Sequence, residues 1–151
     1  MQSFPHHYAV TASGTGEGDV ELAAARVSRL RSASPAEFDG PGDRWSPETL
    51  LVGAVGDCFI LTFRAIAGAS RLPWTSLHCD VIGTLDRVDK VTQFTGFEIR
   101  ARLALPSGVD HALAHRLLEK AERACLISRS LKAETRLVAD IATANDLRPV
   151  A

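Results

Sequence analysis

Hydrophobic and polar residues follow one another along the chain with periods that predict two helices and several strands. The longest apolar stretch, residues 50–69, places apolar side chains on almost every side of a helix with 3.6 residues per turn. Ser46 is placed to cap its start, Pro47 suits the first helical position and Glu48 falls in the first turn. The pattern stops at Gly68. We therefore predict a helix that begins at Pro47 and ends near Gly68.

This stretch is long enough to be mistaken for a membrane span, but two charges argue against one. Asp57 and Arg64 would each cost roughly 2.5–3.5 kcal/mol at the centre of a bilayer. A helix that is apolar all round is instead expected to be surrounded by protein. Because one small chain cannot cover every side of it, we expect a second subunit to supply part of the cover.

Two runs after this helix alternate between apolar and polar residues with period two. The first run covers residues 76–86 and the second covers residues 97–105, with a polar turn at Asp89-Lys90 between them. We predict that they pair as a long antiparallel hairpin with one buried and one solvated face.

A second amphipathic helix and a last strand follow the hairpin. Apolar residues recur at helical spacing over residues 110–124, and Glu119 and Arg123 stand four residues apart on the outer face, where they are expected to pair. Residues 134–142 alternate again and predict a strand.

The N-terminal part predicts short strands at residues 8–12 and 20–24, joined by a glycine-rich turn at residues 13–18. This turn lacks the Gly-Lys-Ser/Thr ending of a phosphate-binding loop and is expected to be a hairpin turn. No repeat and no long linker interrupts the chain, so we expect residues 1–151 to form a single domain.

Composition excludes several classes of function. The chain has 151 residues, 46% of them hydrophobic, and a formal net charge of −1 with neither sign concentrated in one segment, which argues against nucleic acid as a partner. Three cysteines without a C-x-x-C pair do not predict a disulfide scaffold or a zinc site, and no metal or cofactor is expected. The N-terminus lacks the pattern of a signal peptide, so a cytoplasmic location is expected.

The three cysteines differ in their surroundings. Cys79 falls on the buried side of a predicted strand and is interpreted as a small core residue. Cys58 lies in the middle of the first helix and Cys125 at the end of the second. Periodicity alone would assign both to packing, but the two helices could approach each other there, so a disulfide between them is geometrically allowed.

Two segments around this pair carry a family resemblance. Residues 45–59 read WSPETLLVGAVGDCF, and residues 118–128 read LEKAERACLIS. The first resembles a Pro-Glu…Leu-Leu…Ala…Cys helix start, and the second resembles an Ala-Glu-x-x-Cys-Pro-Val-Ser helix end. Both belong to the OsmC/Ohr group, the osmotically inducible and organic-hydroperoxide-resistance proteins, and the resemblance covers roughly residues 40 to 142.

The resemblance implies an α+β fold, in which an intertwined homodimer has two long central helices wrapped by antiparallel sheets. It implies a thiol-dependent peroxidase that reduces organic hydroperoxides, with Cys58 as the peroxidatic cysteine and Cys125 as the resolving cysteine. Glu48 matches the motif glutamate that pairs with an arginine beside the thiol. An external dithiol, such as a lipoyl group, would reduce the Cys58–Cys125 disulfide. The alternative is a dimer of the same fold that binds a small apolar ligand without catalysis.

The chemistry of the thiol sets its own requirement. Only a thiolate attacks a peroxide well, and burial would raise the pKa of Cys58, so we expect a neighbouring cation, best an arginine, to offset this desolvation. The N-terminal loop that carries the arginine in the family has none here; among Arg26, Arg29, Arg31 and Arg44, we choose Arg44, four residues before Glu48.

Three further features depart from, or complicate, the family's pattern. Asp57, a carboxylate next to Cys58, would raise the pKa of the thiol unless it faces away. Leu126 replaces the family's proline after the second cysteine. Glu48 is roughly 15 Å from Cys58 along a helix, so it must act through the arginine or a second subunit.

Overall fold

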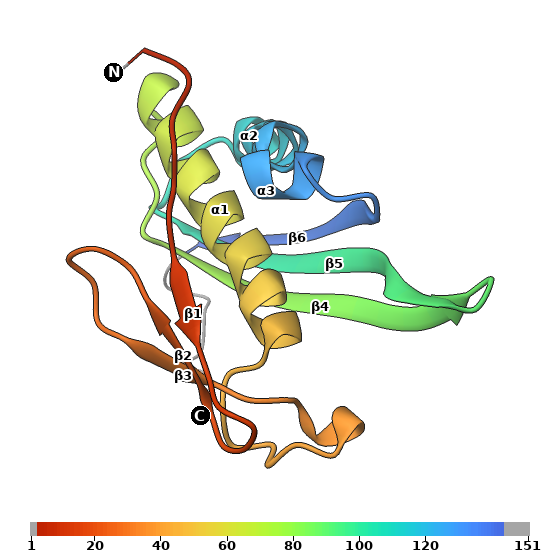
Figure 1. The fold of residues 1–151 in the computed structure, drawn as a ribbon. Coiled ribbons are helices and arrows are strands. Elements are labelled where there is room, and N and C mark those ends of the chain that lie inside the picture. Colours follow the sequence, from red (N-terminus) through yellow and green to blue (C-terminus); the bar gives the residue numbers. More distant parts are fainter. Residues whose placement is uncertain (1–2, 144–151) are drawn as a thin grey trace. The chain divides into compact units, whose positions relative to one another are not determined.

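The computed structural model describes residues 3–143, and the chain divides into two compact units at Leu51. The first unit ends at Leu51 and the second begins at Val52 (Figure 1). Residues 1–2, part of the N-terminal segment that lacks a signal-peptide pattern, lie outside the described range. Each unit has its own sheet, and a single domain over residues 1–151 stays a prediction.

The first unit holds a small antiparallel sheet in the order β1-β2-β3. Its strands are β1 (Thr11–Ser13), β2 (Val20–Ala23) and β3 (Leu30–Ser32), followed by the single 3-10 turn η1 (Ala36–Phe38). The glycine-rich segment joins β1 to β2 as the predicted hairpin turn. The first strand is shorter than predicted because pairing with β2 starts only at Thr11, and β3 was not predicted since three residues show no periodicity.

Helix α1 (Pro47–Ala69) begins and ends where the sequence predicts. Ser46 and Thr49 form a reciprocal cap at its start. The Ser46 backbone N–H donates to the Thr49 hydroxyl over 2.8 Å, and the Thr49 N–H donates to the Ser46 hydroxyl over 3.2 Å. These two bonds satisfy donors that the first turn of a helix leaves free, which fixes where α1 starts.

The second unit is built on a three-stranded sheet in the order β4-β5-β6. The predicted hairpin is confirmed as β4 (Ser76–Val88) and β5 (Val91–Leu105), with the turn at Asp89 and Lys90, both at positive φ. Strand β6 (Glu134–Thr143) pairs with β5 in parallel, so the chain must cross over between them.

The crossover consists of α2 (His111–Ala124) and the short helix α3 (Leu126–Arg129). The Asp110 carboxylate caps α2 by accepting the backbone N–H groups of Ala112 and Leu113 at 2.8 and 3.2 Å. The expected Glu119–Arg123 pair is wrong, because Glu119 instead pairs with His115 on the preceding turn, at 3.6 Å.

Cys125 separates the two helices of the crossover. Its backbone is extended, at φ −62° and ψ 117°, so that it ends α2 and begins α3. Helix α3 was not predicted, since four residues carry too little pattern to be recognised.

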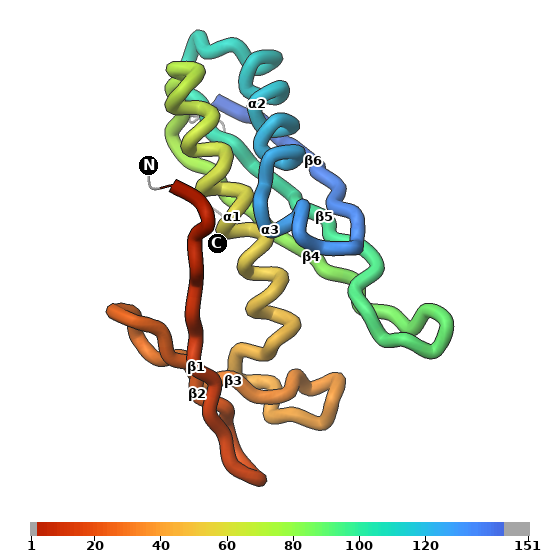
Figure 2. Tube along the Cα trace, turned by 45° about the horizontal axis from the view of Figure 1, so that its top comes forward, coloured from red at the N-terminus to blue at the C-terminus, as the bar shows by residue number. Residues whose placement is uncertain are grey.

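Both long helices of the second unit cover one face of its sheet (Figures 1 and 2). On that face, alternate residues of β5 are all buried: Phe97, Ile99, Ala101, Leu103 and Leu105. Helix α1 adds a buried stripe at every fourth residue: Val55, Phe59, Phe63 and Ala67. Two glycines allow the close approach. A Cβ on Gly56 would lie 3.0 Å from Val81, and one on Gly83 would lie 2.8 Å from both Val52 and Phe94.

We expect Gly83→Ala to lower the free energy of unfolding by about 1–3 kcal/mol, because the new methyl group forces α1 away from the sheet. Gly96→Ala is the matched control on the neighbouring strand, since its Cβ would lie 3.9 Å from the carbonyl oxygen of Glu134, an ordinary van der Waals contact. That variant should leave stability unchanged or raise it by about 0.4–1 kcal/mol. Urea unfolding at one protein concentration measures both, and equal effects would contradict the close approach.

Candidate active site at the Cys58 and Cys125 thiols

The second unit brings Cys58 and Cys125 together. Cys58 lies in the middle of α1 and is half-buried, whereas Cys125 lies between α2 and α3 and is fully buried. Both are free thiols, and the side chain of Cys125 lies near enough to that of Cys58 to lower its pKa. The extended backbone at Cys125 turns the chain so that the residues that follow also reach Cys58.

Hydrogen bonds hold the pKa of Cys58 below its usual value. Burial raises the pKa, but the backbone amide of Ile127, the Cys125 thiol, the Thr62 hydroxyl and the backbone amide of Leu126 together lower it by more. The Thr62 oxygen lies 3.9 Å from the Cys58 sulfur. Because the first backbone N–H groups of a helix have no partner within it, the start of α3 can donate to the sulfur.

Cys125 is shifted in the opposite direction. Its burial raises its pKa, and the nearby Cys58 raises it further, while Ser128 opposes the shift. The Ser128 hydroxyl donates to the Cys125 sulfur over 3.3 Å. Cys58 is therefore the first of the two thiols to ionise, and Cys125 keeps its proton.

The expectation that a cation must offset the burial of Cys58 is not met within residues 52–143, where hydrogen bonds lower the pKa instead. One of these groups, and the hydroxyl that donates to Cys125, left a signal in the sequence that was not used. Thr62 stands four residues after Cys58 on the same helix face, and Ser128 stands three residues after Cys125. The amides left no signal, because they belong to the backbone.

A groove of about 570 Å³ opens beside the Cys58 thiol. Apolar residues from α1 and from the α2–α3 junction form most of its lining: Ala54, Leu61, Ala65, Ile66, Ala124, Leu126 and Ile127. Asp57, Cys58 and Thr62 are its polar residues. Asp57 thus lines the groove, and its carboxylate is not among the groups that shift the pKa of Cys58.

Cys79 lies apart from this pair. It is half-buried on β4, and burial, together with the charge of Asp80, raises the pKa of its thiol to about 12. A thiol that stays protonated at neutral pH is a poor nucleophile.

Glu48 and Arg44 belong to the first unit and do not pair with each other there. The Arg44 side chain forms ion pairs with Asp19 at 3.1 Å and Asp43 at 2.9 Å, and its hydrogen bond to Asp19 helps to raise its pKa. One carboxylate oxygen of Glu48 is buried without a hydrogen-bond partner among the described residues.

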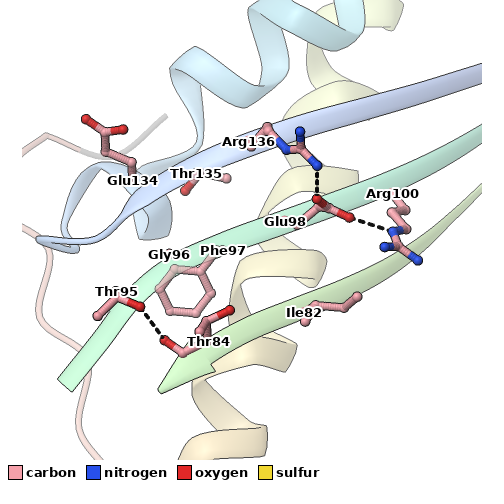
Figure 3. Close-up of a pocket in the computed structure, with 10 residues that line it drawn as sticks. All are labelled: Ile82, Thr84, Thr95, Gly96, Phe97, Glu98, Arg100, Glu134, Thr135 and Arg136. Carbon is pink, nitrogen blue, oxygen red and sulfur yellow. Dashed lines mark hydrogen bonds and ion pairs between the residues drawn. The ribbon is translucent and has the colours of Figure 1, made fainter. Parts of the chain in front are cut away.

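A second hollow, of about 600 Å³, lies at the end of the sheet where β5 and β6 begin (Figure 3). Its two arginines are already paired, because the Glu98 carboxylate binds Arg100 at 2.6 Å and also binds Arg136. The hollow thus offers no free guanidinium to an anion, and the groove beside Cys58 is the better candidate for chemistry.

Within the described residues, no group of three or more His, Cys, Asp or Glu side chains is placed to hold a metal ion. Over the same range, α1 is the one helix that is long and apolar enough to cross a membrane, by length and composition alone. The core helix of a soluble protein meets the same criteria.

Comparison with known proteins identifies the family. Residues 40–139 match the family described as OsmC-like protein. The chain is 31% identical to the uncharacterised protein YmaD of Bacillus subtilis, over 87% of this chain and 91% of the relative. It is 26% identical to peroxiredoxin OsmC of Escherichia coli, over 81% of this chain and 84% of the relative.

Solved structures share the α+β fold. An OsmC-like protein of unknown function from Vibrio cholerae superposes with a TM-score of 0.80 at 16% identity, over 90% of this chain and all of the other. The organic hydroperoxide resistance protein OsmC from Legionella pneumophila gives a TM-score of 0.73 at 20% identity, over 93% and 100%. With its two thiols in contact on this fold, the chain belongs to the OsmC-like protein family.

Proposed function

We propose that the protein is a thiol-dependent peroxidase that reduces organic hydroperoxides, with Cys58 as the attacking and Cys125 as the resolving cysteine. The observation that carries the proposal is a pair of neighbouring thiols whose pKa values are shifted in opposite directions. In such a pair, the thiol with the lower pKa acts as the nucleophile and the other thiol can resolve the oxidised sulfur. Its relatives include a protein named peroxiredoxin and an organic hydroperoxide resistance protein.

In the first step, the Cys58 thiolate attacks the terminal peroxide oxygen. A sulfur–oxygen bond forms, the O–O bond breaks, and the leaving alkoxide takes a proton from solvent in the open groove to give an alcohol. Cys58 becomes a sulfenic acid. The backbone amides of Ile127 and Leu126 lower the pKa of the sulfur and so favour the thiolate that attacks.

In the second step, Cys125 resolves the sulfenic acid. Its thiol loses its proton, attacks the Cys58 sulfur and releases hydroxide, which leaves a Cys58–Cys125 disulfide. Because the two side chains are already neighbours, this step needs no large movement. An external dithiol then reduces the disulfide by exchange and is itself oxidised to a disulfide.

The lining of the groove favours organic over inorganic peroxide. Seven of its ten lining residues are apolar, so an alkyl or aryl group gains free energy by leaving water there, and hydrogen peroxide does not. The volume of about 570 Å³ falls within the range of small-molecule sites.

We also propose that the protein is a homodimer. Apolar side chains around the site remain open to solvent in the single chain, with Leu126 at 74% and Leu61 at 49% exposure. A second copy would cover them, as expected for a helix that is apolar on both faces. A cytoplasmic location also remains part of the proposal.

Glu48 and Arg44 remain proposed site residues. The buried, unpartnered oxygen of Glu48 can accept a guanidinium group. Arg44 would have to leave Asp19 and Asp43 to provide one.

The first expected outcome concerns the pH dependence of alkylation. The rate for Cys58 with iodoacetamide should rise through a midpoint below the usual thiol pKa of about 8.5, because only the thiolate reacts. Cys79 should stay unmodified across the neutral range, since its pKa is about 12. Cys125→Ala should move the Cys58 midpoint upward, because it removes a hydrogen bond that lowers the pKa. Peptide mass spectrometry follows each site, and a Cys58 midpoint above that of free cysteine would contradict the assignment.

The second expected outcome separates the roles of the cysteines. Cys58→Ser should abolish hydroperoxide consumption, because a serine hydroxyl is not ionised near neutral pH. Cys125→Ser should consume about one equivalent and stop at a Cys58 sulfenic acid. Cys79→Ser is the control, with turnover intact and stability lowered by about 1–3 kcal/mol at most.

Turnover is measured with a dithiol as reductant, in separate assays with an organic hydroperoxide and with hydrogen peroxide. Unimpaired turnover in Cys58→Ser, or a disulfide to Cys79, would overturn the assignment. If no dithiol supports turnover above the uncatalysed rate, the alternative of a non-catalytic dimer that binds an apolar ligand is favoured.

The third expected outcome is a dimer in solution. Light scattering at micromolar concentration should give twice the mass of the 16.2 kDa chain. Leu126→Glu should weaken this dimer, because it places a charge on the most exposed apolar side chain of the groove. A stable monodisperse monomer of the unchanged protein would contradict the proposal.

A further inference from the structure

The groove beside Cys58 has an uneven distribution of charge. Apart from Cys58 itself, Asp57 is the one ionisable residue among those that line it. The other lining residues are apolar, except for the Thr62 hydroxyl. A substrate that brings its peroxide to Cys58 therefore passes Asp57, and no cation of residues 52–143 lines the groove beside it.

The Asp57 side chain is free to act on a substrate. It is exposed, and within residues 52–143 no ion pair or hydrogen bond holds its carboxylate. Arg64, the other charged residue of α1 in this unit, is seven residues further along the helix and does not line the groove.

We infer that Asp57 selects substrates by charge, so that the site accepts neutral hydroperoxides and rejects those that carry a carboxylate near the reacting end. This inference rests on the proposed peroxidase function and adds a specificity-determining residue to it. The preferred class is a neutral alkyl, aryl or esterified acyl hydroperoxide. A free fatty-acid hydroperoxide bound with its carboxylate at the groove entrance would meet the like charge of Asp57.

The size of the effect follows from the spacing of charges. Two like charges roughly 8 Å apart at a partly hydrated surface, with an effective dielectric constant of about 40, repel enough to slow a reaction about fivefold. Because the groove is open to solvent, salt should weaken this repulsion.

The first test uses two alkylating reagents of similar size, neutral iodoacetamide and anionic iodoacetate. The quantity compared is the rate with iodoacetamide divided by the rate with iodoacetate at Cys58. Asp57→Asn should lower this ratio about fivefold, and high salt should also lower it for the unchanged protein. The ratio cancels any change in the thiolate fraction, since both reagents need the same thiolate. Asp140→Asn is the matched control, an exposed carboxylate on the sheet face opposite the helices, and should leave the ratio unchanged.

The second test compares a fatty-acid hydroperoxide with its methyl ester as substrates. The unchanged protein should turn over the ester faster, and Asp57→Asn should narrow the difference about fivefold. If the unchanged protein and Asp57→Asn give the same ratio of alkylation rates and the same ratio of substrate turnover, the proposed charge selection is wrong, whatever the peroxidase activity. If neither hydroperoxide is consumed but Asp57→Asn shifts the alkylation ratio, the proposed peroxidase function fails and the charge selection at Cys58 stands.

Discussion

The hydrogen bonds that reach the Cys58 sulfur from the start of α3 are the interaction on which the site depends. They exist because Cys125 adopts an extended backbone that ends α2 and lets a new helix begin at Leu126. The same break places the Cys125 side chain against Cys58. A single local departure from helical geometry thus provides both the donors and the second thiol.

The rest of the second unit holds this junction in place against α1. Helix α1 approaches the sheet closely because Gly56 and Gly83 leave room for Val81 and Val52. Helix α2 packs its buried residues, Leu118 among them, over the same face and carries Cys125 at its end. The parallel pairing of β6 with β5 then requires a crossover over that face, and the break at Cys125 lies within this crossover.

Much of this arrangement follows from the sequence. Helix α1 was predicted to the residue at its start, because Ser46 and Pro47 are strong signals, and the hairpin turn at Asp89 and Lys90 was predicted from its polarity. Periodicity gave the juxtaposition of Cys58 and Cys125 only as geometrically allowed, and the family resemblance implied it. The parallel partner of β5 was not predicted, since periodicity indicates a strand but not its neighbour.

The groups of residues 52–143 that lower the pKa of Cys58 were not predicted, and an activating arginine stays a prediction. The expectation was a charged side chain, because burial demands compensation and arginine is the residue type that supplies it. Backbone amides carry no identity, so Ile127 and Leu126 gave no indication of their role. The pairing of Glu119 with His115 in place of Arg123 shows a related limit, since spacing alone does not choose between two neighbours.

Activation by the backbone has a consequence for how this site can change during evolution. Any amino acid except proline brings the same amide group, so positions 126 and 127 can vary in side chain without loss of the donors. Leu126 stands where the motif that this segment resembles has proline, and it thereby adds an N–H group that an imino acid cannot provide. The donors themselves therefore demand only that these positions are not proline, and a lineage can gain or lose one donor to the thiolate by a single change to or from proline.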